Sequence, residues 1–225
     1  MFTLKRTLQA VIFDLDGVIV DTFELYYQAN KMVADKLGVP FTIEDNEQFR
    51  GIGRNEIIDA LANKSNKTVS LREKAMLAHE KNRYYQQLIE NMDEQSVLPG
   101  MKELIIELSR NKIKIGIASS STNGEVVLHK VGLFSYMDYI VDPKTLLKGK
   151  PDPEIFLLAA EALRVSEENC AAIEDGMAGM KAIHSTKMFS IGIGKDPIME
   201  TADWHVVTTA EITFPELVNR MEADH

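Results

Sequence analysis

The sequence predicts an α/β protein in which a doubly wound parallel sheet carries a small all-helical domain inserted after its first strand. Three observations support this fold class. Short apolar runs alternate with helical patterns from about residue 100 to residue 207, as in proteins built from βα units. A single apolar strand lies far upstream, at residues 10–13. Residues 22–92 show helical patterns and no convincing strand, so the helical segment is expected to interrupt the sheet.

The first strand and the inserted helices follow from local composition. The run Ala10–Phe13 is apolar and contains β-branched and aromatic residues, which favour strands. Helices are predicted over Phe23–Leu37 and over about Ser70–Met92. Gly38-Val39-Pro40 and Gly51-Ile52-Gly53 interrupt the helical pattern, because glycine and proline favour turns. The apolar face of the first helix is formed at near-helical spacing by Leu25, Ala29, Met32, Val33 and Leu37.

After Leu98-Pro99-Gly100 the chain returns to alternating helices and strands. Helices are predicted over Glu125–Val131 and Glu154–Leu163. Strands that alternate with helices in this way are expected to lie parallel and to be joined by right-handed crossovers. The further predicted strands are Lys114–Ala118, Tyr139–Val141, Cys170–Ile173, Phe189–Ile193 and His205–Val207.

These elements predict two domains. Residues 1–20 and 94–225 are expected to form the core domain, and residues 21–93 a helical cap domain. The chain crosses between them at Val18–Asp21 and at Asp93–Pro99, which are predicted to be the hinges of a moving cap.

The most informative motif, Asp14-Leu15-Asp16-Gly17, directly follows the first strand. Residues two apart on a strand share a face, so both carboxylates are expected at the carboxyl end of the strand, where open α/β sheets bind ligands. Two carboxylates this close repel each other unless they share a cation. The motif therefore indicates Mg²⁺-assisted phosphoryl transfer with one aspartate as nucleophile, with a plain acidic Asp-Gly turn as the alternative. A calcium loop is disfavoured because Val18-Ile19-Val20 lacks side-chain oxygen ligands.

Three downstream segments carry similar polar groups. The loop Ser119–Gly124 is rich in hydroxyls and precedes a helix, which is typical of a phosphate cradle and also of an ordinary N-cap cluster. Lys150, followed by Pro151, offers a positive charge to phosphate, or forms a solvated basic turn. Glu174 and Asp175 form a second acidic strand end, for which an Asp-Gly turn is the alternative. An acidic pair, a hydroxyl, a lysine and a second acidic pair occur together in this order by chance far less often than any one of these segments occurs alone.

These four segments resemble the haloacid dehalogenase superfamily and, within it, the β-phosphoglucomutase-like subfamily. The resemblance covers almost the whole chain, including the cap segment 80–85 and the linker 98–100. It implies Mg²⁺ as the cofactor and an aspartyl-phosphate intermediate. The implied reaction converts β-glucose 1-phosphate to glucose 6-phosphate, and a sugar-phosphate phosphatase of the same superfamily is the alternative. A non-catalytic binding protein is disfavoured, because Asp14 and Asp16 are both present.

The resemblance also implies roles for individual residues. Asp14 would be the nucleophile, and Asp16 the general acid and base. Ser119 and Lys150 would hold the oxygens of the transferring phosphoryl group. The implied ligands of Mg²⁺ are the Asp14 carboxylate, the Asp16 backbone carbonyl, Asp175 and, through water, Glu174.

Substrate specificity is expected in the cap and in the loop that faces it. The resemblance places Arg54 on the distal phosphate of the substrate, for which a guanidinium is well suited, with a solvated helix start as the alternative. Lys81 and Asn82 match positions that contact the sugar, although a lysine on a charged helix is equally typical of a solvated face. Ser121 and Asn123 match positions that also face the distal phosphate.

The chain departs from the subfamily pattern around the expected substrate. Tyr26 stands where these mutases carry histidine, and a tryptophan expected near Asn30 is absent. Arg50 and Thr122 each stand where lysine is usual. The catalytic core is thus expected to be intact while the surroundings of the acceptor are changed, which leaves mutase and phosphatase open.

Composition limits the possible partners. A net charge of −9 over 225 residues argues against nucleic acid and against an anionic membrane, so local cations must attract an anionic substrate. Asp14 and Asp16 interrupt the first apolar run well short of a signal or membrane segment. The single cysteine, Cys170, excludes an intrachain disulfide and lies in a predicted buried strand. We therefore expect a cytoplasmic monomer that binds a small-molecule sugar phosphate.

Overall fold

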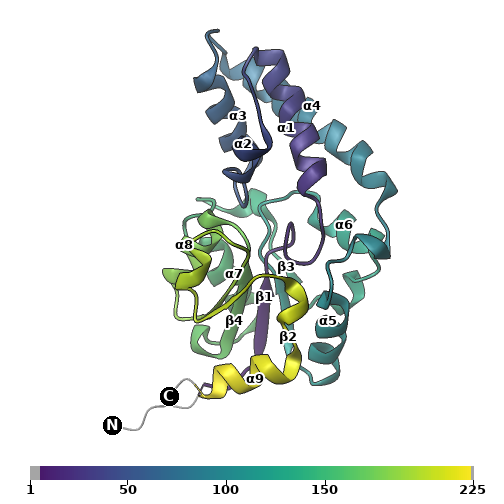
Figure 1. The fold of residues 1–225 in the computed structure, drawn as a ribbon, viewed down its shortest axis with the longest axis vertical. Coiled ribbons are helices and arrows are strands. Elements are labelled where there is room, and N and C mark those ends of the chain that lie inside the picture. The colour runs from purple at the N-terminus through teal and green to yellow at the C-terminus, as the bar shows by residue number, and fades with distance from the viewer. Residues whose placement is uncertain (1–5, 224–225) are drawn as a thin grey trace.

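The computed structural model describes residues 6–223, which contain one parallel sheet (Figure 1). Its strands are β1 (Ala10–Phe13), β2 (Lys114–Ile117), β3 (Tyr139–Ile140), β4 (Cys170–Glu174), β5 (Phe189–Ile193) and β6 (Trp204–Val206). The order β3-β2-β1-β4-β5-β6 places β1 between β2 and β4, and every neighbouring pair is parallel. The chain adds strands outward on both sides of β1, which confirms the predicted doubly wound sheet.

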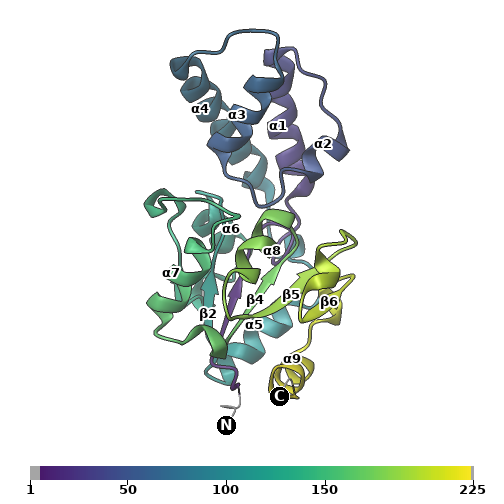
Figure 2. The same ribbon diagram turned by 90° about the vertical axis from the view of Figure 1, so that its left-hand side faces the viewer.

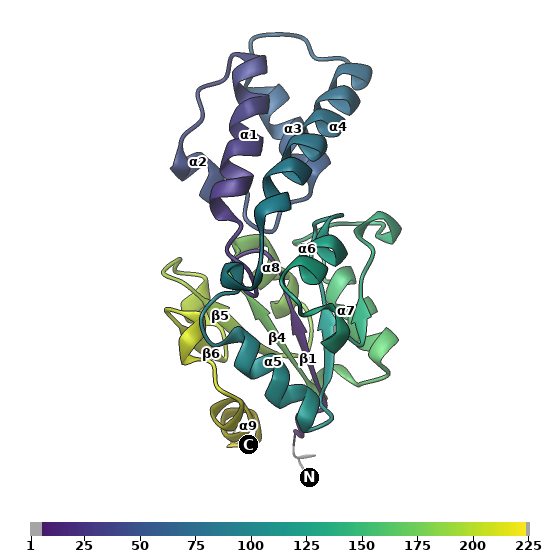
Figure 3. The same cartoon turned by 90° about the vertical axis from the view of Figure 1, so that its right-hand side faces the viewer.

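Helices cover both faces of the sheet. Side chains alternate along β1, so successive residues pack against the helices of opposite faces. The core helices are α5 (Met101–Arg110), α6 (Gly124–Lys130), α7 (Glu154–Leu163), α8 (Met177–His184) and α9 (Phe214–Ala223). Val11 and Phe13 belong to an apolar cluster with residues of α5, α6 and α9. Ala10 and Ile12 belong to a second cluster with residues of α7 and α8. Figures 2 and 3 show the molecule from two opposite sides, with these helices around the strands.

Four helices form a separate layer beyond one end of the sheet, at the top of Figure 1. They are α1 (Phe23–Leu37), α2 (Ile43–Glu47), α3 (Arg54–Lys64) and α4 (Leu71–Leu88). Val33, Ile58 and Leu61 lie at the centre of an apolar cluster that belongs to this layer alone. Ser70 and Glu73 form a capping box that fixes the start of α4. Within residues 6–223, none of the helices is long and apolar enough to cross a lipid bilayer.

Several element boundaries differ from the prediction by one residue, and the end of α4 differs by more. α4 ends at Leu88, four residues early, and a short 3-10 helix, η1 (Ile89–Asn91), continues the chain. β6 begins one residue early at Trp204, because Trp204 packs into the core while Val207 is 48% exposed. The other 3-10 helices are η2 (Glu94–Ser96), η3 (Phe134–Tyr136), η4 (Pro143–Thr145), η5 (Glu167–Asn169), η6 (Met199–Thr201) and η7 (Thr209–Glu211).

The two crossings between the sheet and the helical layer run side by side. Val20 forms an isolated antiparallel bridge with Val97. The backbone N–H of Asp21 donates to the Ser96 carbonyl at 3.0 Å, and that of Leu98 donates to the Ile19 carbonyl at 2.9 Å. The helical layer is therefore attached through a narrow pair of hydrogen-bonded segments.

The fold predicts a large difference between two leucine truncations. Leu108 on α5 is fully buried, whereas Leu147 is 92% exposed. Leu108→Ala should lower the free energy of unfolding by about 2–5 kcal/mol, because it removes buried contacts and leaves a cavity. Leu147→Ala is the control and should leave stability nearly unchanged in the same urea titration. Equal effects of the two substitutions would contradict the assigned packing of α5.

Candidate active site

The candidate site lies at the carboxyl ends of β1, β2 and β4, where parallel pairing brings their last residues together. Asp14 directly follows β1, and its N–H donates to the Ile173 carbonyl of β4 at 3.0 Å. On the other side, Ala118 at the end of β2 donates to the Phe13 carbonyl at 2.8 Å. These bonds hold the loops after all three strands close to one another, and Asp14 is almost fully buried between them.

Lys150 joins two of these strand ends. Its Nζ lies 2.5 Å from Asp14 Oδ1 and 2.7 Å from Glu174 Oε2, and the lysine side chain is completely buried. Burial alone would lower the pKa of Lys150, but the two carboxylates outweigh it and raise this pKa above its usual value. Lys150 is therefore a fixed positive charge at the base of the site.

Glu174 is held in place by its own loop. Its Oε1 accepts hydrogen bonds from the backbone N–H of Asp175 at 3.0 Å and of Gly176 at 2.9 Å. A side chain at Gly179 would place its Cβ 1.8 Å from Glu174 Oε2, so only glycine leaves space for this carboxylate. The turn after β4 thus fixes Glu174 against Lys150.

Asp14, Glu174 and Asp175 form an acidic cluster in which one carboxylate oxygen from each lies within 4.8 Å of the others. Burial, followed by the charge of Glu174, raises the pKa of Asp175 to about 7. The pKa of Asp14 is also raised by burial, although Lys150 opposes the shift. Three clustered carboxylates supply the hard oxygen ligands that divalent cations such as Mg²⁺ require, so the donor set fits the predicted metal.

Asp16 has different surroundings from Asp14. Its Oδ1 accepts a hydrogen bond from Thr22 Oγ1 at 2.7 Å. Its Oδ2 accepts from Ser119 Oγ at 3.3 Å and from the Tyr26 hydroxyl at 3.4 Å. Burial raises the pKa of Asp16 although these hydrogen bonds lower it, and its carboxylate is not part of the acidic cluster. A protonated carboxylic acid is therefore favoured here more than at an exposed aspartate.

A cavity between the sheet and the helical layer brings the predicted catalytic and substrate-binding residues together. Its core side carries Asp14 and Asp16, and its cap side carries Arg54 and Lys81. Lys150, Glu174 and Asp175 are not on its lining; the lysine lies behind Asp14. The other predicted site residues on the lining are Asn82, Ser119, Ser121 and Asn123.

The wall opposite Asp14 is a network that crosses from the helical layer to the core. The Arg54 Nη2 donates to Asn82 Oδ1 at 2.7 Å and to Thr122 Oγ1 at 2.5 Å. Asn123 Nδ2 donates to the same Asn82 oxygen at 3.0 Å. Arg54 is thus held by one residue of α4 and one of the loop after β2, with its guanidinium beside the cavity.

Comparison with known proteins agrees with this arrangement. Residues 8–185 match the family model of haloacid dehalogenase-like hydrolases. The chain belongs to this family. It is 43% identical to the β-phosphoglucomutase of Bacillus subtilis (strain 168) over 217 residues, which cover 96% of each protein. It is 33% identical to the phosphorylated carbohydrates phosphatase of Thermotoga maritima over 79% of this chain and 81% of the phosphatase.

A solved structure extends the similarity to three dimensions. The crystal structure of β-phosphoglucomutase from Clostridium difficile matches with a TM-score of 0.92 and 38% identity, over 96% of this chain and 98% of that one. The resemblance inferred from four short segments of sequence is therefore confirmed, and so is the haloacid dehalogenase-like fold with its helical insertion.

Several residues on or next to the cavity lining were not identified as site residues from the sequence. Tyr26, noted only as a departure, stacks on Tyr85 with ring centroids 4.4 Å apart, and its hydroxyl lies 2.9 Å from Ser121 Oγ. Gln86 Nε2 donates to Asn123 Oδ1 at 3.2 Å. Tyr85 and Gln86 lie four and five residues after Lys81 on α4, so helical spacing from a predicted site lysine was the available signal.

The position near the missing tryptophan holds a buried amide pair. Asn30 Nδ2 donates to Asn46 Oδ1 at 2.8 Å, and both residues are almost fully buried. Within the described residues, Asn30 Oδ1 has no hydrogen-bond partner. In place of the expected tryptophan, this region thus holds a polar contact between α1 and α2.

Lys81 is a buried lysine without a carboxylate partner among residues 6–223. It is 3% exposed, and its ammonium lies 5.7 Å from the Tyr26 ring centroid. Burial, together with the nearby Arg54 charge, lowers the pKa of Lys81 to about 7. An unpaired buried ammonium costs stability in the ligand-free protein, and an anion entering the cavity would relieve that cost.

This cost predicts that Lys81→Met stabilises the ligand-free protein. Because the pKa of Lys81 falls from 10.5 when unfolded to about 7 when folded, the folded state binds fewer protons between these pH values. The penalty is therefore complete below pH 7 and decreases as the pH rises. Urea titrations should show a larger advantage of Lys81→Met over wild type at pH 7 than at pH 9. Lys195→Met, at an exposed lysine, is the control and should show no such pH dependence.

Proposed function

We propose that this protein is a Mg²⁺-dependent sugar-phosphate phosphomutase that converts β-glucose 1-phosphate to glucose 6-phosphate. One observation carries the proposal. A single cavity has Asp14 and Asp16 on its core side and the cationic side chains of Arg54 and Lys81 on its cap side. A substrate with a reacting phosphate at one end and a second phosphate at the other would satisfy both sides. The likeness to two β-phosphoglucomutases supports the same conclusion.

In the proposed reaction Asp14 is the nucleophile. One of its carboxylate oxygens forms a bond to phosphorus while the bond from phosphorus to the leaving oxygen breaks, which gives an aspartyl phosphate. Lys150, 2.5 Å from Asp14, would offset charge on the transferring phosphoryl oxygens, together with the hydroxyl of Ser119. In the second step the phosphoenzyme gives its phosphoryl group to the 6-hydroxyl of β-glucose 1-phosphate, and the bond from phosphorus to Asp14 breaks as the bond to the sugar oxygen forms. The resulting bisphosphate has a phosphate at each end, and transfer of its 1-phosphate to Asp14 leaves glucose 6-phosphate and reloads the enzyme.

Asp16 is the proposed general acid and base. It would give a proton to the leaving sugar oxygen in the first step and take one from the attacking hydroxyl in the second. Its raised pKa favours the protonated form that the first step needs. Thr22 holds one carboxylate oxygen and Ser119 the other, so the proton is exchanged from a fixed position.

We propose Mg²⁺ as the cation of the acidic cluster. Asp14, Glu174, Asp175 and the backbone carbonyl of Asp16 would hold it. When bound, Mg²⁺ would offset the negative charge of the phosphoryl group during transfer. Support comes from the mutual distances of the three carboxylates, since such a cluster concentrates negative charge that a cation would balance.

Residues 21–93 are proposed to move as a cap on a core of residues 1–20 and 94–225. The cavity between the two has a volume of about 50 Å³, which is room for only a few waters. A sugar phosphate is much larger and therefore enters only if the cap opens. The paired segments 18–21 and 93–99 would act as hinges, and closure would protect the aspartyl phosphate from water.

A phosphatase is the second candidate. The relative from Thermotoga maritima carries that activity in its name, and Tyr26 and Thr122 change the surroundings of the acceptor. In a phosphatase, water rather than a sugar hydroxyl would take the phosphoryl group from Asp14. Turnover of β-glucose 1-phosphate with Mg²⁺ and a bisphosphate primer separates the two, because a mutase yields glucose 6-phosphate and a phosphatase yields inorganic phosphate.

We further propose that the protein works in the cytoplasm as a monomer. Every proposed site residue comes from one chain, and the single cysteine, Cys170, is buried and is not needed for a disulfide. Light scattering of the purified protein measures its molar mass and so tests whether it is a monomer.

Replacement of Asp14 or Asp16 by asparagine should impair the reaction in different ways. Asp14→Asn should abolish turnover, because an amide does not attack phosphorus. Asp16→Asn should retain Mg²⁺ and substrate binding but lose roughly 10²–10⁴-fold in rate, because only proton transfer is removed. Steady-state rates and trapping of the phosphoenzyme measure both effects. Covalent phosphate on a residue other than Asp14, or a loss of Mg²⁺ affinity as the main effect at Asp16, would contradict these roles.

Removing Arg54 should shift the product ratio toward hydrolysis. Arg54→Ala loses a charge-assisted contact to the distal phosphate worth roughly 1.5–3 kcal/mol, and that binding energy would otherwise favour the closed cap. Glucose 6-phosphate and inorganic phosphate are measured together for the wild type and the variant. Arg83→Ala, at an exposed arginine of α4, is the control and should leave the ratio unchanged. A wild type that already releases mainly phosphate from every sugar phosphate favours the phosphatase.

A further inference from the structure

Arg50, in the loop between α2 and α3, reaches from the helical layer to the core. Its Nη1 donates to Asp175 Oδ2. The same guanidinium pairs with Glu47, through Nε at 2.5 Å and Nη2 at 3.2 Å, and lies 4.6 Å from the ring centroid of Phe23. Glu47 and Phe23 thus hold the guanidinium in place, and the Asp175 side chain that it contacts is only 7% exposed.

The backbone around this ion pair is shaped to admit it. Gly17 has a φ of 86°, and a Cβ there would lie 2.0 Å from Asp175 Oδ2 and 2.9 Å from Arg50 Nη1. A Cβ at Gly176 would lie 3.0 Å from the Arg50 carbonyl oxygen. Two glycines of the core therefore leave the space in which the Arg50 loop and its guanidinium pack against the acidic cluster.

The ion pair faces a groove on a different side from the substrate cavity. Arg50 and Asp175 line this groove with Glu47, Met177 and Lys195, and neither lines the cavity that contains Asp14. A cation in the groove therefore has both the Asp175 carboxylate and the Arg50 guanidinium beside it. The groove thus offers an entry path to the acidic cluster that is separate from the path of the sugar phosphate.

We propose that Arg50 is an internal competitor for the divalent cation and couples cation binding to release of the cap. Arginine is always charged, and a carboxylate shared by two cations brings those cations into mutual repulsion. A cation in the acidic cluster would therefore displace the guanidinium from Asp175, while Glu47 keeps it on the cap side. Loss of this contact removes one of the ties that hold the helical layer on the core.

The coupling acts in both directions, because linkage between two equilibria is reciprocal. Occupation of the cluster by a cation weakens the ligand-free closed arrangement in which Arg50 contacts Asp175, and that arrangement weakens cation binding. Closure over a bound substrate is favoured instead by the proposed contact of Arg54 with the distal phosphate. The metal-free protein is then held closed by its own guanidinium, and cation entry prepares it to open for substrate. This inference rests on the proposed metal site, although not on which sugar phosphate is the substrate.

The first test measures cation binding without turnover. Metal-free wild type, Arg50→Gln, Arg50→Lys and the control Arg83→Gln are titrated with Mn²⁺ at pH 8, and free Mn²⁺ is counted by electron paramagnetic resonance. Arg83 is exposed on the cap, so the control removes the same charge away from the cluster. Arg50→Gln should bind Mn²⁺ about 5- to 150-fold more tightly than wild type and control, as expected for a coupling of about 1–3 kcal/mol. Arg50→Lys should fall between them.

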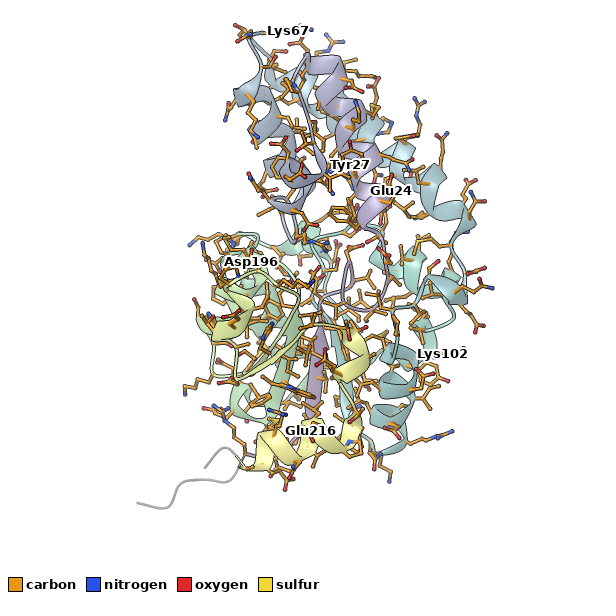
Figure 4. The ribbon with its side chains drawn as sticks, in the orientation of Figure 1. Glu24, Tyr27, Lys67, Lys102, Asp196 and Glu216 are labelled. Atoms are coloured by element: carbon orange, nitrogen blue, oxygen red, sulfur yellow. The ribbon has the colours of Figure 1, made fainter. Side chains whose placement is uncertain are left out.

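The second test follows the cap. Figure 4 shows Lys67 at the far end of the helical layer and Glu216 at the opposite end of the core. Spin labels on Lys67→Cys and Glu216→Cys report the distance between the two, and buried Cys170 should escape labelling because burial raises the pKa of its thiol to about 12. Mg²⁺ should lengthen the distance in wild type, and Arg50→Gln should show the longer distance before Mg²⁺ is added.

The outcomes separate this inference from the proposed function. Mn²⁺ binding by Arg50→Gln that equals or is weaker than that of wild type overturns the competition. A distance between the labels that changes neither with Mg²⁺ nor with Arg50→Gln overturns the coupling. Either result leaves a metal-dependent mutase intact. Absence of Mn²⁺ binding in every protein refutes the metal site and this inference together. If Arg50→Gln fails to fold, as judged by circular dichroism, the intermediate affinity expected of Arg50→Lys decides.

Discussion

The ion pairs of Lys150 with Asp14 and Glu174 are the interaction on which the site depends. The three side chains come from the loop before α7, the end of β1 and the end of β4, and all are buried. The lysine compensates the burial of both carboxylates, because an unpaired buried charge is strongly disfavoured. The positions of the nucleophile and of the acidic cluster therefore follow from one buried cation, and the close packing at Gly179 leaves Glu174 little space to move away.

A second constraint is that the cavity has two walls from different parts of the chain. The core wall carries Asp14, Asp16 and Ser119, which are proposed to act on the phosphoryl group, and the cap wall carries the cations of Arg54 and Lys81, which have no carboxylate partner on the cavity lining apart from the opposite core wall. Polar contacts join the cap to the core: Ser120 Oγ donates to the Gly51 carbonyl at 2.8 Å, Arg54 contacts Thr122, Asn123 contacts Asn82 and, outside the cavity, Arg50 contacts Asp175. Apolar contact is added by Ala29 of α1 and Tyr85 of α4, which belong to the same buried cluster as residues of the sheet, so the interface between the two layers is both polar and apolar.

Asp14 and Asp16 have the same side chain, but their different surroundings suit them to different proposed roles. Asp14 is buried beside two carboxylates, which raises its pKa, and it faces Lys150, which opposes the shift and favours the charged form that the proposed nucleophile needs. Asp16 faces hydroxyls of Thr22, Ser119 and Tyr26, which tolerate either protonation state and so suit proton transfer. The unpaired Lys81 follows the same logic on the cap side, since a group that is costly without a ligand contributes binding energy when an anion arrives. Lys81 is thus expected to lower the stability of the ligand-free protein and to strengthen the binding of an anion.

The sequence by itself determined the fold class, most strand and helix positions and the catalytic side of the site. Apolar runs and their breaks are local properties, and Asp14, Ser119, Lys150 and Asp175 each follow a strand or precede a helix in a pattern that is visible along the chain. Tertiary structure alone decided what depends on contacts between distant segments. The Arg50–Asp175 pair joins residues 125 positions apart, and the Tyr26 hydroxyl reaches Ser121 across 95 positions. No local pattern encodes such distances, because they depend on how the helical layer settles on the sheet.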